Sequence, residues 1–157
     1  MNILFLCTGN SCRSILSEAL FNAQAPVGYC ACSAGSQPSG KVHPLTIKTL
    51  ENLHINTQNL RSKSMQDCEP FNPEIVITVC SSAAQETCPL YLGKALKVHW
   101  GLDDPSHLDL PEQEKLQAFQ MTVAHIQRRF NAFFALDLAK LSREELSKEM
   151  QKIAEMI

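Results

Sequence analysis

Apolar residues along this chain follow two patterns that alternate. Short apolar or β-branched runs occur at residues 2–6, 29–33, 75–79 and 95–100. Such runs are typical of strands buried in a sheet, whereas the intervening segments repeat apolar residues every three or four positions, as amphipathic helices do. The clearest helical pattern runs from Leu116 to Phe133. The chain therefore reads as strands and helices in alternation.

Local signals mark where two further helices begin. Pro44 is well placed at the first position of a helix, whose inward face we assign to Ile47, Leu50 and Leu53. Ser142 and Glu145 have the spacing of a capping box, which predicts the start of the last helix. The alternation predicts a doubly wound, four-stranded parallel α/β sheet flanked by helices, formed by one domain over residues 1–157. Ligands of such sheets bind at the carboxyl ends of the strands.

Composition narrows the functional classes. The 157 residues are 45% hydrophobic with a formal net charge of −2, which suits one core and provides no global field that would attract nucleic acid or an anionic membrane. The first apolar run is too short for a signal peptide or a membrane span. Seven cysteines, an odd number, lack zinc-finger spacing. We therefore expect a cytoplasmic protein with reduced thiols, no metal, and no nucleic-acid or membrane partner.

A loop rich in small and polar residues separates the first strand from the first helix. It reads Cys7-Thr8-Gly9-Asn10-Ser11-Cys12-Arg13-Ser14. Backbone N–H groups of a loop that runs into a helix N-terminus converge on an anion, and the Arg13 guanidinium adds a planar fork of donors. The same positive surroundings predict that the pKa of Cys7 is lowered, so that Cys7 is a thiolate at pH 7. We therefore expect residues 8–14 to bind an oxyanion and Cys7 to attack it.

Cysteines in a strand-turn-helix unit can also be small buried hydrophobic residues. A packing role for Cys7 does not explain Gly9, Asn10, Arg13 and Ser14 at their offsets, so C-x5-R-S favours the nucleophile. For Cys12, packing inside the loop is the better interpretation.

The loop sequence C-T-G-N-S-C-R-S resembles that of the low-molecular-weight tyrosine phosphatases and of the arsenate reductases built on their fold. Ser33-Ala34-Gly35, the strand before Cys80 and Asp104-Pro105 also lie where that family has them. The resemblance implies a phosphatase loop whose thiolate attacks phosphorus or arsenic. It also implies that Asp104 is the general acid that protonates the leaving oxygen. By itself, Asp103-Asp104-Pro105 is equally typical of a turn.

A second pair of cysteines distinguishes the two chemistries. A phosphatase needs one sulfur, whereas a reductase must deliver two electrons through a second thiol that attacks Cys7. Cys80 follows a predicted strand, and Cys88 lies seven intervening residues beyond it. This arrangement resembles the relay of thioredoxin-linked arsenate reductases, with Cys80 as first and Cys88 as second resolving thiol. In the alternative interpretation Cys88 is a loop thiol, and glutathione with glutaredoxin resolves the disulfide.

Three other residues, Asn10, Glu18 and Ser33, resemble ligands of a potassium ion in some relatives. Ser64 stands where a further carboxylate would be expected, so we predict no bound metal. No bound cofactor is expected either. The implied partners are arsenate, with phosphate or sulfate as competing oxyanions, and thioredoxin or glutaredoxin as a transient electron donor.

Three functions are compatible with these residues. The first is an arsenate reductase that uses Cys7, Arg13, Asp104, Cys80 and Cys88. The second is a low-molecular-weight tyrosine phosphatase, but Ser106-His107-Leu108 follow Asp104-Pro105 where those enzymes usually carry aromatic residues. The third is a non-catalytic anion sensor, which would not need Cys7, Arg13 and Asp104 together. We therefore predict an arsenate reductase.

Overall fold

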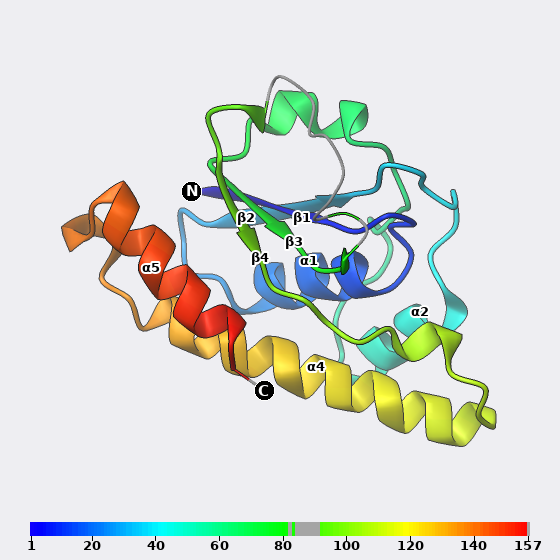
Figure 1. Ribbon diagram of the computed structural model, residues 1–157. Helices are drawn as coiled ribbons and strands as arrows, with labels where there is room; N and C mark the ends of the chain where they lie inside the picture. The colour runs from blue at the N-terminus through cyan, green and yellow to red at the C-terminus, as the bar shows by residue number, and fades with distance from the viewer. Residues whose placement is uncertain (82, 84–91, 157) are drawn as a thin grey trace.

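Four parallel strands form the centre of the molecule (Figure 1). The computed structural model describes residues 1–81, 83 and 92–156. The strands are β1 (Asn2–Leu6), β2 (Cys30–Ala34), β3 (Ile75–Thr78) and β4 (Leu96–His99), in the order β2-β1-β3-β4. All three pairings are parallel. The predicted four-stranded parallel α/β sheet is therefore confirmed.

Helices cover the sheet. They are α1 (Arg13–Gln24), α2 (Pro44–Asn52), α4 (Glu112–Phe134) and α5 (Arg143–Ala154), with 3-10 helices η1 (Gln66–Phe71), η3 (Pro105–His107) and η4 (Leu138–Lys140). In Figure 1, α1 and α4 lie below the sheet, and η1 lies above it. The predicted capping box of Ser142 and Glu145 is present at the start of α5.

An aromatic cluster joins β1 to the helices below it. Phe5 on β1 packs against Phe21 of α1 and Phe130 of α4, with ring centroids 6.0 and 5.7 Å apart. Phe21 and Phe130 themselves meet edge to face at 5.3 Å, and all three rings are at most 1% exposed. Edge-to-face packing adds to the free energy gained by burying these large rings. This core fixes α1, and with it the loop that precedes α1.

Helix α2 buries Leu50 as predicted, but its inward face is turned away from Ile47 and Leu53. Its buried residues are Leu45, Thr46, Thr49 and Leu50, whereas Leu53 is 42% exposed. The two threonines can be buried because their hydroxyl groups donate to backbone carbonyls, Thr46 to Ser11 at 3.1 Å and Thr49 to Leu45 at 2.6 Å. The prediction followed apolar residues alone and missed this face.

The strand order places a switch point beside β1. From β1 the chain crosses to β2 on one side, and it later returns to β3 on the other side. Leu6 at the end of β1 pairs with Thr78 at the end of β3. The carboxyl ends of these two strands are where a doubly wound sheet binds its ligand. Cys7 follows β1 directly, and Cys80 follows β3 after Val79.

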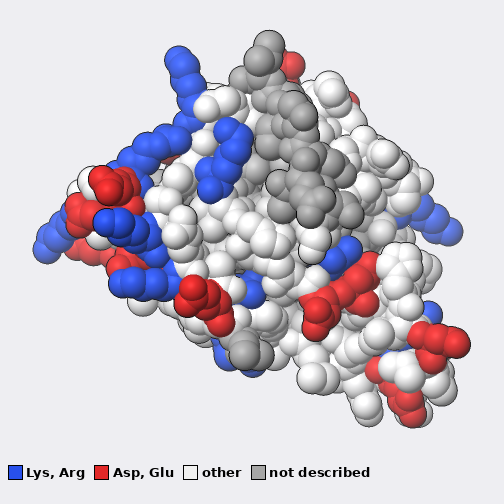
Figure 2. Space-filling view, viewed as in Figure 1, with Lys and Arg blue, Asp and Glu red and all other residues white. Residues whose placement is uncertain are grey.

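Charged side chains of both signs are interspersed on the surface. In Figure 2, basic and acidic groups alternate over the α5 end of the molecule, where Lys148 pairs with Glu144 and Lys152 with Glu149. None of the helices in the described part of the chain combines the length and apolar composition that crossing a membrane requires.

Candidate active site

The predicted anion loop encloses a cavity of about 430 Å³. The residues that line it are Cys7, Thr8, Gly9, Asn10, Ser11, Cys12, Arg13, Cys80, Ser81, Asp104 and His107. The loop leaves β1 after Leu6 and enters α1 at Arg13, so the positive end of a helix adjoins the cavity. The structure thus brings together the predicted nucleophile, the predicted clamp, the predicted acid and Cys80. Ser14, predicted to bind the anion, instead lies buried beneath the loop.

The carbonyl oxygens of the loop are held from outside. Thr8 O accepts a hydrogen bond from the N–H of Gln37 at 3.0 Å, Gly9 O from Ser39 at 2.9 Å, and Ser11 O from His43 at 2.9 Å. Because these carbonyls already have partners, the loop conformation is fixed before any ligand arrives. Preorganised donors of this kind lower the cost of binding an anion.

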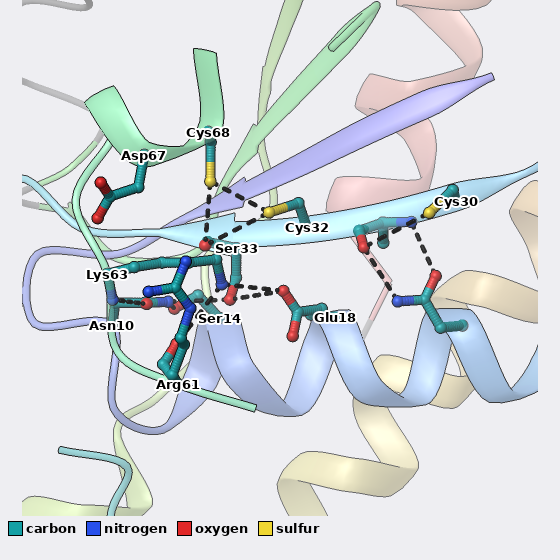
Figure 3. A network of polar contacts seen from close by, with 12 residues as sticks. Asn10, Ser14, Glu18, Cys30, Cys32, Ser33, Arg61, Lys63, Asp67 and Cys68 are labelled. Carbon is teal, nitrogen blue, oxygen red and sulfur yellow. Dashed lines mark hydrogen bonds and ion pairs between the residues drawn. The ribbon is translucent and has the colours of Figure 1, made fainter. Parts of the chain in front are cut away.

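Asn10 supports the loop from beneath. It is fully buried and has a φ of 47°, in the left-handed region that asparagine tolerates better than most residues. Its side-chain amide donates to Ser14 Oγ at 2.8 Å and to Ser33 Oγ at 3.0 Å, and its Oδ1 accepts from the N–H of Lys63 at 2.9 Å (Figure 3). Asn10 and Ser33 therefore tie the loop to β2 and to the segment before η1.

A buried ion pair completes this network. Ser33 Oγ donates to Glu18 Oε1 at 3.2 Å, and Lys63 Nζ lies 3.3 Å from the same oxygen (Figure 3). The Lys63 and Glu18 side chains are only 10% and 9% exposed. Asn10, Glu18 and Ser33 resemble the potassium ligands of some relatives, but here Lys63 lies against Glu18. Its ammonium group is the cation that faces Glu18 in this structure.

Gly35 allows β2 to approach the loop closely. A Cβ atom at this position would lie 2.5 Å from Thr8 O and 2.9 Å from Cys7 O. Both atoms belong to the backbone, so they can move only if the loop moves.

We therefore expect Gly35→Ala to lower the free energy of unfolding by about 1–3 kcal/mol, measured by denaturant titration. Gly9→Ala is the matched control, because the nearest atom to its Cβ, Ser11 Oγ, would lie 3.9 Å away. Equal losses of stability in the two variants would contradict this explanation.

Cys7 and Cys80 line the same cavity, and each thiol shifts the pKa of the other. Around Cys80, the sulfur accepts from Thr8 N–H at 3.4 Å and from Ala83 N–H at 3.4 Å. The Thr8 hydroxyl lies 3.6 Å from the same sulfur. The pairing of β1 with β3 sets this geometry, since it brings the residues after Leu6 and Thr78 side by side.

The pair alters the acidity of both sulfurs. The hydrogen bond from Cys7, helped by the N–H of Ala83 and both donors of Thr8, lowers the pKa of Cys80 to about 5. The same hydrogen bond and burial raise the pKa of Cys7, although Arg13 opposes them. The predicted low pKa of Cys7 is therefore wrong for this arrangement, in which Cys80 carries the negative charge and Cys7 the shared proton.

Cys80→Ser should consequently make Cys7 more reactive. The variant removes the acceptor and the negative charge that raise the pKa of Cys7, while Arg13 remains. Because a thiolate is the reactive form, alkylation of Cys7 by iodoacetamide at pH 7 should accelerate about tenfold for each unit by which its pKa falls. Mass spectrometry of the labelled peptide measures this rate, with Cys30→Ser as control. An unchanged or slower rate would contradict the shared proton.

Arg13 and Asp104 meet at the edge of the cavity. Arg13 Nη2 lies 3.2 Å from Asp104 Oδ2, and its Nη1 donates to Leu102 O at 3.0 Å. Asp104 also caps η3, because its Oδ1 accepts from Ser106 N–H at 2.9 Å and from Ser106 Oγ at 2.6 Å. Asp104 therefore caps the turn and also lies beside Arg13. His107 Nε2 lies 3.2 Å from Asp104 Oδ2.

Cys12 also lines the cavity. Cys12 is buried, and burial raises its pKa to about 12, as a packing residue requires. Asp103 is exposed and does not line the cavity. Cys88 falls outside the described residues.

Comparisons with known proteins place the chain in a family. The family model for low molecular weight phosphotyrosine protein phosphatase matches residues 2–152. An arsenate reductase of Bacillus subtilis (strain 168) is 33% identical over 131 residues, which are 83% of this chain and 93% of that protein.

Solved structures extend the likeness in fold. The thioredoxin-dependent arsenate reductase of Corynebacterium glutamicum is 24% identical with a TM-score of 0.58, over 81% of this chain and 60% of that one. The low molecular weight protein tyrosine phosphatase of T. tengcongensis is 22% identical with a TM-score of 0.62, over 83% of this chain and 98% of that one. The chain therefore belongs to the low-molecular-weight phosphotyrosine protein phosphatase family, as a relative of its arsenate reductases.

Proposed function

We propose that this protein reduces arsenate to arsenite, with Cys7 as the nucleophile and Cys80 as the first resolving thiol. The observation that carries the proposal is that these two thiols line one cavity, which an anion-binding loop forms, and that they interact there. A phosphatase needs only the first sulfur, whereas reduction requires both. The arsenate reductase of Bacillus subtilis that resembles this chain supports the same choice.

The first step is attack on arsenic. Arsenate binds to the loop N–H groups, and the guanidinium of Arg13, oriented by Leu102 O, binds two of its oxygens. The shared proton passes from Cys7 to Cys80, so that Cys7 attacks as a thiolate. A sulfur–arsenic bond forms and an arsenic–oxygen bond breaks.

The leaving oxygen then needs a proton to depart as water. Asp104 lines the same cavity and supplies it in our proposal. His107, whose side chain is 85% exposed, lies 3.2 Å from Asp104 Oδ2 and connects the carboxyl group with solvent. Through this contact the acid can be reprotonated after each cycle.

The second step transfers the electrons. Cys80 first releases the proton it took from Cys7 to solvent water in the open cavity. The resulting thiolate then attacks the sulfur of Cys7 and forms a disulfide. The electron pair of the broken sulfur–arsenic bond stays on arsenic, which leaves as arsenite. We propose that Cys88 then attacks Cys80 and carries the disulfide to thioredoxin. The thioredoxin-dependent relative supports this donor, while glutathione with glutaredoxin is the alternative.

Turnover by the purified protein tests the function. Arsenite production from arsenate with thioredoxin, thioredoxin reductase and NADPH is expected, and a parallel assay replaces thioredoxin with glutathione and glutaredoxin. Hydrolysis of an aryl phosphate is measured alongside. Rapid phosphate release without arsenite in either assay would overturn the reductase and favour a phosphatase.

Asp104→Asn should slow the formation of the arsenic adduct by about 10²–10⁴-fold, because it removes a proton donor. The exchange between Cys7 and Cys80 should be unaffected, since no sulfur is changed. Single-turnover kinetics separate the two steps, and Asp103→Asn is the matched control outside the cavity. If Asp104→Asn stalls only when the donor recycles the enzyme, the role of Asp104 is wrong.

A further inference from the structure

A second pair of thiols lies on the η1 side of β2, across the strand from the network of Asn10 and Glu18 (Figure 3). Cys32 on β2 and Cys68 on η1 have their Sγ atoms 3.1 Å apart (Figure 3). Cys68 is 1% exposed, whereas Cys32 is partly exposed. Neither residue lines the active-site cavity, so the reaction proposed above leaves this pair without a role.

The two thiols are chemically unequal. The hydrogen bond from Cys68 lowers the pKa of Cys32, with a further contribution from the Lys63 ammonium. The same hydrogen bond and burial raise the pKa of Cys68. Cys32 is thus the more acidic and more accessible thiol, with a protonated partner beside it. Cysteines of this kind, placed next to a resolving thiol, are the ones that oxidants select.

We propose that Cys32 and Cys68 form a reversible disulfide in the presence of a hydroperoxide, and that this bond fastens η1 to β2. The two sulfurs must approach each other by only about 1 Å to reach bonding distance. Residues 33–67 would lie within the closed loop.

The disulfide forms in two steps. The Cys32 thiolate attacks the peroxide, whose oxygen–oxygen bond breaks, and yields a sulfenic acid and hydroxide (or alkoxide). The Cys68 sulfur then displaces the sulfenic oxygen, which leaves as water with the Cys68 proton. A dithiol reductant reverses the bond with two electrons.

The disulfide would connect η1 to residues that contact the anion loop. Ser33 follows Cys32 directly, its carbonyl accepts from Cys68 Sγ at 3.5 Å, and its hydroxyl accepts from Asn10. Nearby, Gly35 N–H donates to Lys63 O at 2.9 Å and pairs with Ser64. The bond would therefore link η1 to the strand on which the loop rests, and we expect it to stabilise the folded protein.

Peptide mapping tests the pairing in the unaltered chain. The protein is treated with hydrogen peroxide, the remaining thiols are blocked, and the product is cleaved after lysine, arginine and glutamate. Cleavage after Lys63 and Glu74 separates Cys68 from Cys80 and Cys88, since Pro70 blocks cleavage after Glu69. We expect a disulfide between residues 64–74 and the peptide that contains Cys32. Recovery of Cys68 as a free thiol while Cys32 is converted to sulfinic acid would overturn the proposal.

Thermal unfolding measures the consequence. Oxidised protein should melt about 5 °C or more above reduced protein, and Cys32→Ser should lose this increment. Cys30→Ser, two residues away on the same strand and exposed, should retain it. Equal increments in both variants would assign the effect to another pair and contradict the proposal. Since no arsenate is used, this result is independent of the proposed reductase activity.

Discussion

Replacing Cys7 with serine should reduce arsenite formation by about 10⁴-fold or more, because a neutral hydroxyl is a far poorer nucleophile than a thiolate. The rest of the anion loop should keep its structure in this variant. The loop carbonyls are held by Gln37, Ser39 and His43, and none of these contacts involves the sulfur. The measurement is arsenite release under saturating thioredoxin.

Phosphate protection against thermal unfolding is the control for an intact loop. Cys7→Ser should retain it, since bound anion stabilises any variant that keeps the site. Cys30→Ser, which changes an exposed thiol, should keep normal turnover. Substantial arsenite production by Cys7→Ser would mean that the loop cysteine is not the nucleophile.

Replacing Cys80 with serine should abolish catalytic turnover while leaving the attack on arsenate intact. The structure places Cys80 in hydrogen-bond contact with Cys7, so it is the sulfur best positioned to attack the adduct. Rapid mixing should show the adduct forming without arsenite release. With Cys88→Ser, in contrast, one equivalent of arsenite should appear and a disulfide between Cys7 and Cys80 should accumulate.

Peptide mapping after a single turnover identifies that disulfide. If Cys88→Ser sustained full turnover with glutathione and glutaredoxin, the relay would consist of Cys7 and Cys80 alone. If Cys80→Ser also remained fully active, glutathione would be attacking the adduct directly. The intramolecular mechanism would then have to be abandoned.

Local signals in the sequence were sufficient for the fold and for the grouping of the loop, Asp104 and Cys80. Buried strands, helical spacing and a turn of small residues all act over a few positions, and parallel strands bring their carboxyl ends to one edge. The acidity of Cys7 could not be obtained this way. It depends on the sulfur of Cys80, which only the pairing of β1 with β3 brings to it.

The contacts that support the anion loop could not be predicted for the same reason, because they join residues far apart in the sequence. Lys63 reaches Glu18 across 45 positions, and Cys68 reaches Cys32 across 36. Neither residue belongs to a local motif, so neither was selected. The inward face of α2 was mispredicted for a related reason, because the buried Thr46 is satisfied by Ser11 in a distant loop.

The way the loop is held has a consequence for how this protein can diverge. Gln37 and Ser39 have exposed side chains, yet their backbone N–H groups hold Thr8 O and Gly9 O. Every residue except proline carries such a group. Mutations of Gln37 and Ser39 can therefore change the exposed side chains of this segment while the loop keeps its shape. The geometry of the loop can be inherited separately from the surface beside it.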